Sequence, residues 1–117
     1  MTDSFLADLN SQINLFSDER DWSQFHSPKN LSMALIVEAA ELVEHFQWMQ
    51  ADESDLLTNE KRLQVGDELA DILIYTVRLA NRLNIDLEKA AQEKMRKNKI
   101  KYPIEKSRGR SEKYTEL

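Results

Sequence analysis

Two pairs of acidic residues, each pair spaced three positions apart, are the feature of this sequence that bears most on chemistry: Glu38-x-x-Glu41 and Glu68-x-x-Asp71. Both pairs interrupt apolar stretches with helical periodicity, where a carboxylate is costly to bury unless something compensates its charge. Residues three apart lie on one face of a helix, so two such helices could bring four carboxylates together. Only cations can hold such a cluster, and oxygen-only ligands favour Mg²⁺ or Mn²⁺.

The two pairs occupy equivalent positions on their helices. With Glu38 and Glu68 each set to zero at 100° per residue, Glu41 and Asp71 both fall at about 300°. The apolar stripe of each helix lies at roughly 20° to 160°, so both pairs sit on the same shoulder of the stripe. Packing the stripes together would bring the shoulders within reach. The alternative is two solvated acidic faces, the commoner explanation for any single Glu-x-x-Glu pair.

The elements that must position these acids are long helices. The chain has two Gly and two Pro in 117 residues, so long stretches lack helix breakers. The periodicity predicts helices over residues 4–18, 30–50, 59–83 and 87–101, give or take a residue or two. Expected N-caps are Ser27 or Asn30, Asn59 and Asp86 for the second, third and fourth helices.

The predicted fold class is therefore all-α, an antiparallel four-helix bundle-type subunit. We expect one domain at residues 1–103, followed by a polar, extended tail at residues 104–117. A chain this short gains from pairing exposed apolar faces, which favours assembly into a homo-oligomer.

Composition narrows the function classes. The chain has no cysteine, which suits a reducing cytoplasm and excludes zinc-thiolate sites and thiol nucleophiles. Neither a signal peptide nor a membrane-spanning run is visible. Residues 94–113 carry nine Lys or Arg against two acids, so the rest of this chain of net charge −5 is strongly acidic. The acidic body argues against stable nucleic-acid binding, although a basic tail leaves that alternative open.

Several side chains could complete a phosphate-handling metal site. Di-iron bundles use Glu-x-x-His, whereas His45 stands four residues after Glu41, so the all-oxygen set fits Mg²⁺ better. Such sites keep positions for water and substrate phosphates. Candidate phosphate-binding residues are Lys29, Asn30, Lys94, Asn98 and Lys101. The alternative for each lysine is an ordinary solvated surface position.

Aromatic side chains lie in the loop before the second predicted helix and close to the acids on the second and third. Rings with polar edges stack on flat bases, so we expect a base and sugar pocket. Its candidate residues are Trp22, Phe25, His26, Trp48 and Tyr75. Core or subunit-interface packing is the alternative for each ring. A non-enzymatic helical adaptor that uses the aromatic loop at residues 20–30 as a partner-binding surface also remains open.

The order and spacing of these motifs resemble the MazG-like all-α nucleotide pyrophosphohydrolases, over about residues 4–117, and within them the dCTP pyrophosphatase branch. The resemblance is carried by residues 20–31 (RDWSQFHSPKNL), by both acidic pairs, and by Phe46-Gln47-Trp48, Tyr75, Lys94-Met95, Tyr102-Pro103 and the closing KYTEL.

The resemblance implies hydrolysis of a nucleoside triphosphate, dCTP or a related pyrimidine nucleotide, to monophosphate and pyrophosphate. It implies that Glu38, Glu41, Glu68 and Asp71 bind Mg²⁺, with Mn²⁺ as a possible substitute, and that subunits form a homotetramer, a dimer of dimers, whose pockets are lined by more than one chain. Two positions differ from the family pattern. Ile13 stands where the mammalian branch has a substrate-contacting histidine, and Val37 where many members have a further acid.

The expected mechanism follows from this set of residues. A water molecule held by metal and by Glu41 or Glu38 attacks the α-phosphorus, and pyrophosphate leaves toward the metal and Lys94 or Lys101. The reaction requires no protein nucleophile.

Overall fold

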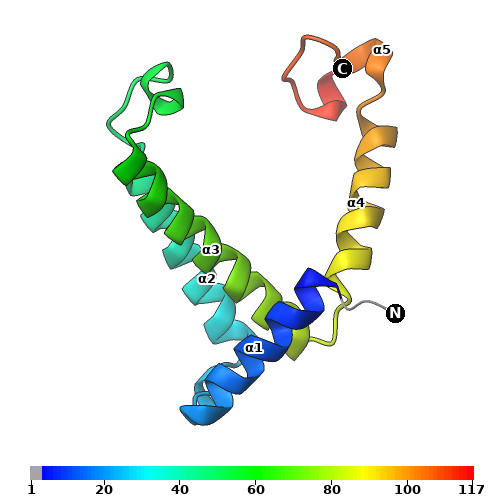
Figure 1. The fold of residues 1–117 in the computed structure, drawn as a ribbon. Helices are drawn as coiled ribbons and strands as arrows, with labels where there is room; N and C mark the ends of the chain where they lie inside the picture. Colours follow the sequence, from blue (N-terminus) through cyan, green and yellow to red (C-terminus); the bar gives the residue numbers. More distant parts are fainter. Residues whose placement is uncertain (1–3) are drawn as a thin grey trace. The chain divides into compact units, whose positions relative to one another are not determined.

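The structure, a computed structural model, describes residues 4–117, and this part of the chain contains helices and no strand. Residues 1–3, part of the segment in which we expected no signal peptide, lie outside the described residues. The helices in chain order are α1 Phe5–Glu19, α2 Pro28–Glu44, α3 Asn59–Arg82, α4 Leu87–Lys101 and α5 Ile104–Ser107 (Figure 1). The predicted all-α class is confirmed, while the four-helix bundle arrangement stays a prediction.

Side-chain caps fix where the long helices begin. Ser27 Oγ accepts a hydrogen bond from the Asn30 backbone N–H at 3.1 Å, and Asp86 Oδ1 accepts one from Lys89 N–H at 3.1 Å, so both expected caps are present. Pro28 occupies the first turn of α2, where its missing N–H costs nothing. The expected cap of α3 was wrong by one residue: Thr58 Oγ1, not Asn59, accepts from Lys61 N–H at 3.1 Å.

The second helix ends earlier than its sequence pattern predicts, at Glu44 rather than near Gln50. Beyond that point the backbone forms tighter bonds between residues three apart, including Phe46 N–H to Val43 C=O at 2.9 Å and Met49 N–H to Phe46 C=O at 2.9 Å. This tightening needs no Gly or Pro, which is why the sequence does not reveal it. Trp48 therefore lies in a turn, and its predicted place on the helix is wrong.

The chain divides into two compact units, one ending at Ile85 and one covering 86–117. In the first unit α2 and α3 run side by side as an antiparallel pair, and α1 packs against α3 toward the end where α2 begins (Figure 1). Asn84, with a left-handed φ of 57°, ends α3, and the Ile85 N–H bonds to Ala80 C=O at 2.8 Å. The antiparallel pair is what places Glu38 and Glu68 on neighbouring helices.

The interior of the described chain is small. Its buried apolar side chains are Ile13, Leu31, Val65, Val77 and Ala80. Large apolar side chains lie exposed on the outer face of α2, where Ile36 is 66% exposed and Val43 55%. No helix in residues 4–117 combines the length and apolar character needed to cross a membrane.

The second unit contains α4 and the C-terminal residues. We expected an extended tail after residue 103, but the segment forms α5 and a 3-10 turn at Tyr114–Glu116. Aromatic contact explains the difference: the rings of Tyr102 and Tyr114 meet edge to face at 6.0 Å, and Lys101 Nζ lies 5.0 Å from the Tyr114 ring. The boundary of the expected domain at residue 103 stays a prediction.

Candidate active site

Three of the four predicted metal-binding acids meet between α2 and α3. One carboxylate oxygen each from Glu38, Glu41 and Glu68 lies within 4.8 Å of the others. Glu38 and Glu41 are one turn apart on α2, and Glu68 comes from the facing helix. Oε2 of Glu38 and Oε2 of Glu68 are buried and receive no hydrogen bond from the described residues. Buried oxygens without a donor are what a cation site requires, so these residues fit a divalent metal ion.

The crowding of the carboxylates changes their acidity. Burial, followed by the neighbouring Glu41 carboxyl and the charges of Asp71 and Glu68, raises the pKa of Glu38 to about 7. Burial and the Glu41 carboxyl also raise the pKa of Glu68, against the opposing influence of His45. The charged forms of Glu38 and Glu68 are therefore unfavourable unless a cation lies among these carboxylates.

His45 and Lys61 stand beside this cluster. His45 Nε2 lies 3.8 Å from Glu68 Oε1, and Lys61 Nζ lies 3.2 Å from His45 Nδ1. Lys61 can only donate, so the Nδ1 of His45 accepts. This pair places positive charge at one edge of the acidic cluster.

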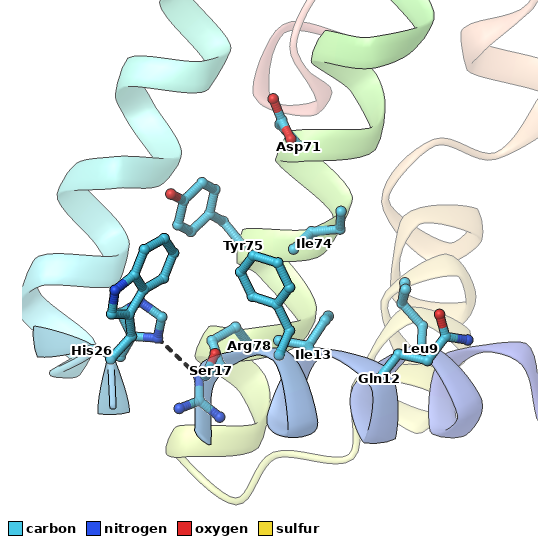
Figure 2. Close-up of a pocket in the computed structure, with 11 residues that line it drawn as sticks. Leu9, Gln12, Ile13, Ser17, His26, Asp71, Ile74, Tyr75 and Arg78 are labelled. Carbon is cyan, nitrogen blue, oxygen red and sulfur yellow. Dashed lines mark hydrogen bonds between the residues drawn. The ribbon is translucent and has the colours of Figure 1, made fainter. Parts of the chain in front are cut away.

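Asp71, the fourth predicted ligand, lies one turn beyond Glu68 and belongs to the edge of a neighbouring cavity of about 430 Å³. Its carboxylate lies outside the group of three oxygens, but its charge reaches them and raises the pKa of Glu38. Tyr75, a turn farther along, lines the same cavity (Figure 2). Burial, then the charges of Glu38, Asp71 and Glu41, raises the pKa of Tyr75, so the cavity and the acids adjoin.

The remaining walls of the cavity come from α1 and from the aromatic loop at residues 20–30. Trp22 and His26 face it from the loop, with ring centroids 6.3 Å apart, and Trp22 also meets Phe16 edge to face at 5.6 Å. Buried Ile13 lines the cavity from α1. An apolar floor with tryptophan, tyrosine and histidine at its sides can accept a flat, partly polar group.

Local backbone geometry shapes the aromatic loop. Asp21 takes a left-handed φ of 56°, which Asp tolerates, and the Trp22 N–H bonds to Ser17 C=O at 2.9 Å as α1 ends. The Asn30 side chain, from the first turn of α2, donates to Phe25 C=O at 3.0 Å. The loop is thus tied to both helices that flank it.

Comparison with known proteins decides the family. The sequence profile of the MazG-like family matches residues 33–117. The chain belongs to the MazG-like family. It is 46% identical over 114 residues to dCTP pyrophosphatase 1 of Bos taurus, covering 96% of this chain and 68% of that protein. Against dCTP pyrophosphatase 1 of Homo sapiens it is 45% identical over 114 residues, covering 96% of this chain and 67% of the relative.

A solved structure agrees. A pyrophosphatase from Archaeoglobus fulgidus superposes with a TM-score of 0.82 at 36% identity, covering 88% of this chain and 96% of that one. These matches confirm the predicted MazG-like membership and the predicted enzyme class, a nucleotide pyrophosphohydrolase. They do not favour the helical adaptor.

The other residues predicted to bind base, sugar or phosphate are not gathered at this cavity. Phe25 is 59% exposed and Trp48 is 90% exposed, and neither lines it. Lys29 is exposed at the start of α2, and the Asn30 amide is engaged with the loop. Lys94, Asn98 and Lys101 lie on α4, in the unit described separately, so their predicted contacts with phosphate stay predictions.

Arg78 is the site residue that sequence reasoning missed in this MazG-like chain. It lines the cavity, is 5% exposed, and donates hydrogen bonds to three side chains from α1 and the loop. A signal was available, because Asp71, Tyr75 and Arg78 recur at i, i+4 and i+7 on one face of a helix. Arg78 therefore lies on the same face of α3 as Asp71 and Tyr75.

Proposed function

We propose that this protein hydrolyses dCTP or a related pyrimidine nucleoside triphosphate to the monophosphate and pyrophosphate, with Mg²⁺ as the native cation and Mn²⁺ as a substitute. The observation that carries the proposal is the cluster of Glu38, Glu41 and Glu68, which has buried, undonated oxygens and adjoins a cavity walled by aromatic rings. The names of the relatives, which are 45% to 46% identical to this chain, support the choice of dCTP as substrate.

The residues divide the work between them. Glu38, Glu41, Glu68 and Asp71 would hold the divalent cation, which would neutralise phosphate charge and make its water more acidic. Trp22, His26 and Tyr75 receive the base and sugar. Trp48 and Phe25 do not line the cavity of their own subunit, and they complete the pocket where subunits meet. Lys94, Asn98 and Lys101, with Lys29 and Asn30, bind the phosphates.

The chemical step needs one base and no protein nucleophile. Glu41 or Glu38 orients a water molecule and takes its proton as the water oxygen bonds to the α-phosphorus. The bond between the α-phosphorus and the bridging oxygen breaks, and pyrophosphate leaves with its charge met by Lys94 or Lys101. Positioning and charge stabilisation supply most of the acceleration in such reactions.

The working form is a homo-oligomer, which we propose is a tetramer. The small interior of the described chain and the exposed apolar face of α2 support association, since an apolar surface of this kind is stabilised by a partner. We propose a cytoplasmic location, because a chain without cysteine is suited to a reducing compartment. The residues before Lys94 carry a net negative charge, which disfavours stable binding to nucleic acid.

A panel of nucleotides tests the function. The protein is incubated with each common deoxynucleoside and ribonucleoside triphosphate, in Mg²⁺ or in EDTA, and pyrophosphate is measured. We expect release from dCTP first among them, only with Mg²⁺ or Mn²⁺. Equal release in EDTA would rule out the metal, and release from purine nucleotides alone would rule out the proposed substrate.

A further inference from the structure

The aromatic loop is held in place by one buried guanidinium. Arg78 Nη1 donates to Asn14 Oδ1 on α1 at 2.7 Å, Nη2 to Ser23 Oγ at 3.1 Å, and Nε to His26 Nδ1 at 3.3 Å. Figure 2 shows the last of these bonds at the lower edge of the cavity. Asn14 belongs to α1, whereas Ser23 and His26 belong to the loop. A single side chain of α3 therefore sets the position of the loop against α1 and α3.

The three acceptors are an amide oxygen, a hydroxyl oxygen and an imidazole nitrogen, none of which is a carboxylate. A guanidinium is donor-only and stays charged, so each partner must present a lone pair. Ser23 Oγ does so while donating its own proton to Asp18 Oδ1 at 3.2 Å, which brings an acid into the network through one hydroxyl. Burying a guanidinium is costly unless its donors are satisfied, so the network is not an incidental surface contact.

The hydrogen bond to His26 decides where that imidazole carries its proton. Since Nδ1 accepts from Arg78, a neutral His26 must hold its proton on Nε2. An imidazolium would turn Nδ1 into a donor facing another donor. Among the hydrogen bonds of residues 4–117, the His26 side chain makes the one to Arg78, which leaves Nε2–H for a ligand in the cavity that His26 lines.

We propose that Arg78 is a positioning residue that fixes His26 as the Nε2–H tautomer, so that the pocket offers one directed donor to an acceptor atom on the base of the nucleotide. The acceptor is a carbonyl oxygen or an unprotonated ring nitrogen, and a base that presents a donor there is disfavoured. The identity of the ligand in this inference rests on the proposed function. The tautomer of His26 rests only on its hydrogen bond with Arg78.

The charges around His26 agree with this assignment. Burial, then Arg78 and Arg82 on α3, lowers the pKa of His26, while Asp18 faces the network only through Ser23. His26 is accordingly neutral near pH 7. Trp22, the other neighbour across the cavity, carries no charge.

Nitrogen NMR of the full-length protein labelled with ¹⁵N-histidine tests the tautomer directly. The chain has two histidines, so the signal lost in His26→Gln identifies His26. We expect wild-type His26 to be neutral and protonated on Nε2 at pH 7, and to titrate below its ordinary range. In Arg78→Met a second tautomer should appear and the pKa should rise, with Arg78→Lys intermediate because a lysine can still donate to one acceptor. Arg62→Met, which removes an exposed arginine from the same helix, should change nothing.

Kinetics give the second arm. In Arg78→Met we expect KM for the preferred nucleotide to rise about tenfold, the worth of one hydrogen bond, with kcat nearly unchanged and a smaller preference among bases. A merely structural role would lower stability and kcat without moving the His26 spectrum. A wild-type His26 protonated on Nδ1, or an Arg78→Met protein with wild-type spectrum and preference, overturns the proposal.

The two arms separate this inference from the proposed function. If no nucleotide is hydrolysed, the proposed function fails, and so does the proposed recognition of the base by His26. The NMR spectrum still decides which tautomer His26 adopts. If hydrolysis proceeds but the wild-type tautomer is wrong, only the inference fails. Should Arg78→Met not fold, the wild-type spectrum and Arg78→Lys decide the matter.

Discussion

Three glutamate side chains, Glu38, Glu41 and Glu68, face one another across α2 and α3 with fewer donors than their charge demands. A protein that only needed to pack two helices would be better served by apolar residues at these positions. The unfavourable arrangement is explained if a cation replaces the missing donors when the enzyme works. At the scale of single residues, the account therefore predicts separate effects on catalysis and on stability.

Replacing Glu41 by Gln should remove turnover while leaving the fold intact. The amide keeps the size of the side chain but can neither take a proton nor bind a cation as strongly, so we expect kcat to fall by about 10²- to 10⁴-fold. Pyrophosphate release measures the rate, and circular dichroism checks the helix content. The matched control is Glu44→Gln, exposed one turn later on α2. Wild-type turnover in Glu41→Gln would remove this residue from the mechanism.

The metal-free protein should lose stability as pH rises. The pKa of Glu38 is 4.5 when unperturbed and about 7 in the folded chain. Between those values the folded state holds a proton that the unfolded state has released, so the free energy of unfolding decreases with rising pH. We expect Tm in EDTA to fall across that window and to stay low above it. Added Mg²⁺ should restore Tm at high pH.

A glutamine variant provides the control for this pH effect. In Glu38→Gln the dependence of Tm on pH in EDTA should be weaker, because the group that titrates is gone. An equally steep decline in that variant would show that other residues cause the effect.

The sequence was informative about the acids and less so about their surroundings. Period and spacing are enough to place Glu38, Glu41 and Glu68 on matched shoulders of two helices, because helix geometry is the same everywhere. The partners of Arg78 are not predictable in this way, since Asn14 and Ser23 lie 64 and 55 residues away along the chain. Long-range hydrogen bonds follow from the tertiary arrangement, which no local pattern encodes.

At the scale of elements, the caps and the ends of helices decide which side chains reach the site. The caps Ser27 and Asp86 follow from simple rules, whereas the early end of α2 comes from a tightening of backbone bonds with no breaker residue. That end moves Trp48 off the helix and leaves its ring 90% exposed. A ring so exposed in one subunit can take part only by reaching a pocket formed with another.

Trp48→Ala should therefore weaken substrate binding without slowing the chemical step. Loss of one stacked ring corresponds to about a tenfold rise in KM, with kcat close to wild type. Steady-state kinetics with dCTP measure both constants. The control is Leu56→Ala, which truncates another exposed side chain (82%) in the same connection between α2 and α3. If KM for Trp48→Ala matches that of the control, the indole does not contact the nucleotide.

At the scale of the whole molecule, the described chain buries little apolar surface and leaves many large apolar side chains exposed. A single subunit is therefore less stable than an assembly that covers them. The outer face of α2 exposes Met33, Ile36, Val37 and Val43, each more than half exposed. An exposed apolar surface of this kind is characteristic of a subunit interface. Neither the extent of that face nor the folding of the C-terminal tail onto Tyr102 follows from the sequence pattern alone, because both depend on which neighbours are present.

Ile36→Asp should dissociate the assembly. An aspartate in an apolar interface loses its water without gaining a partner, which favours smaller species. Light scattering coupled to size exclusion should report a lower mass than for wild type, and Ile36→Val should retain the wild-type mass. A mass equal to wild type in Ile36→Asp would place the interface on another face.

The most direct test of the central claim follows the products of dCTP by ³¹P NMR in water enriched in ¹⁸O, with Mg²⁺ present. If the carboxylates of α2 and α3 direct water to the α-phosphorus, the products are dCMP and pyrophosphate, and the heavy oxygen appears in dCMP. Release of orthophosphate, or ¹⁸O in the pyrophosphate, would contradict the account.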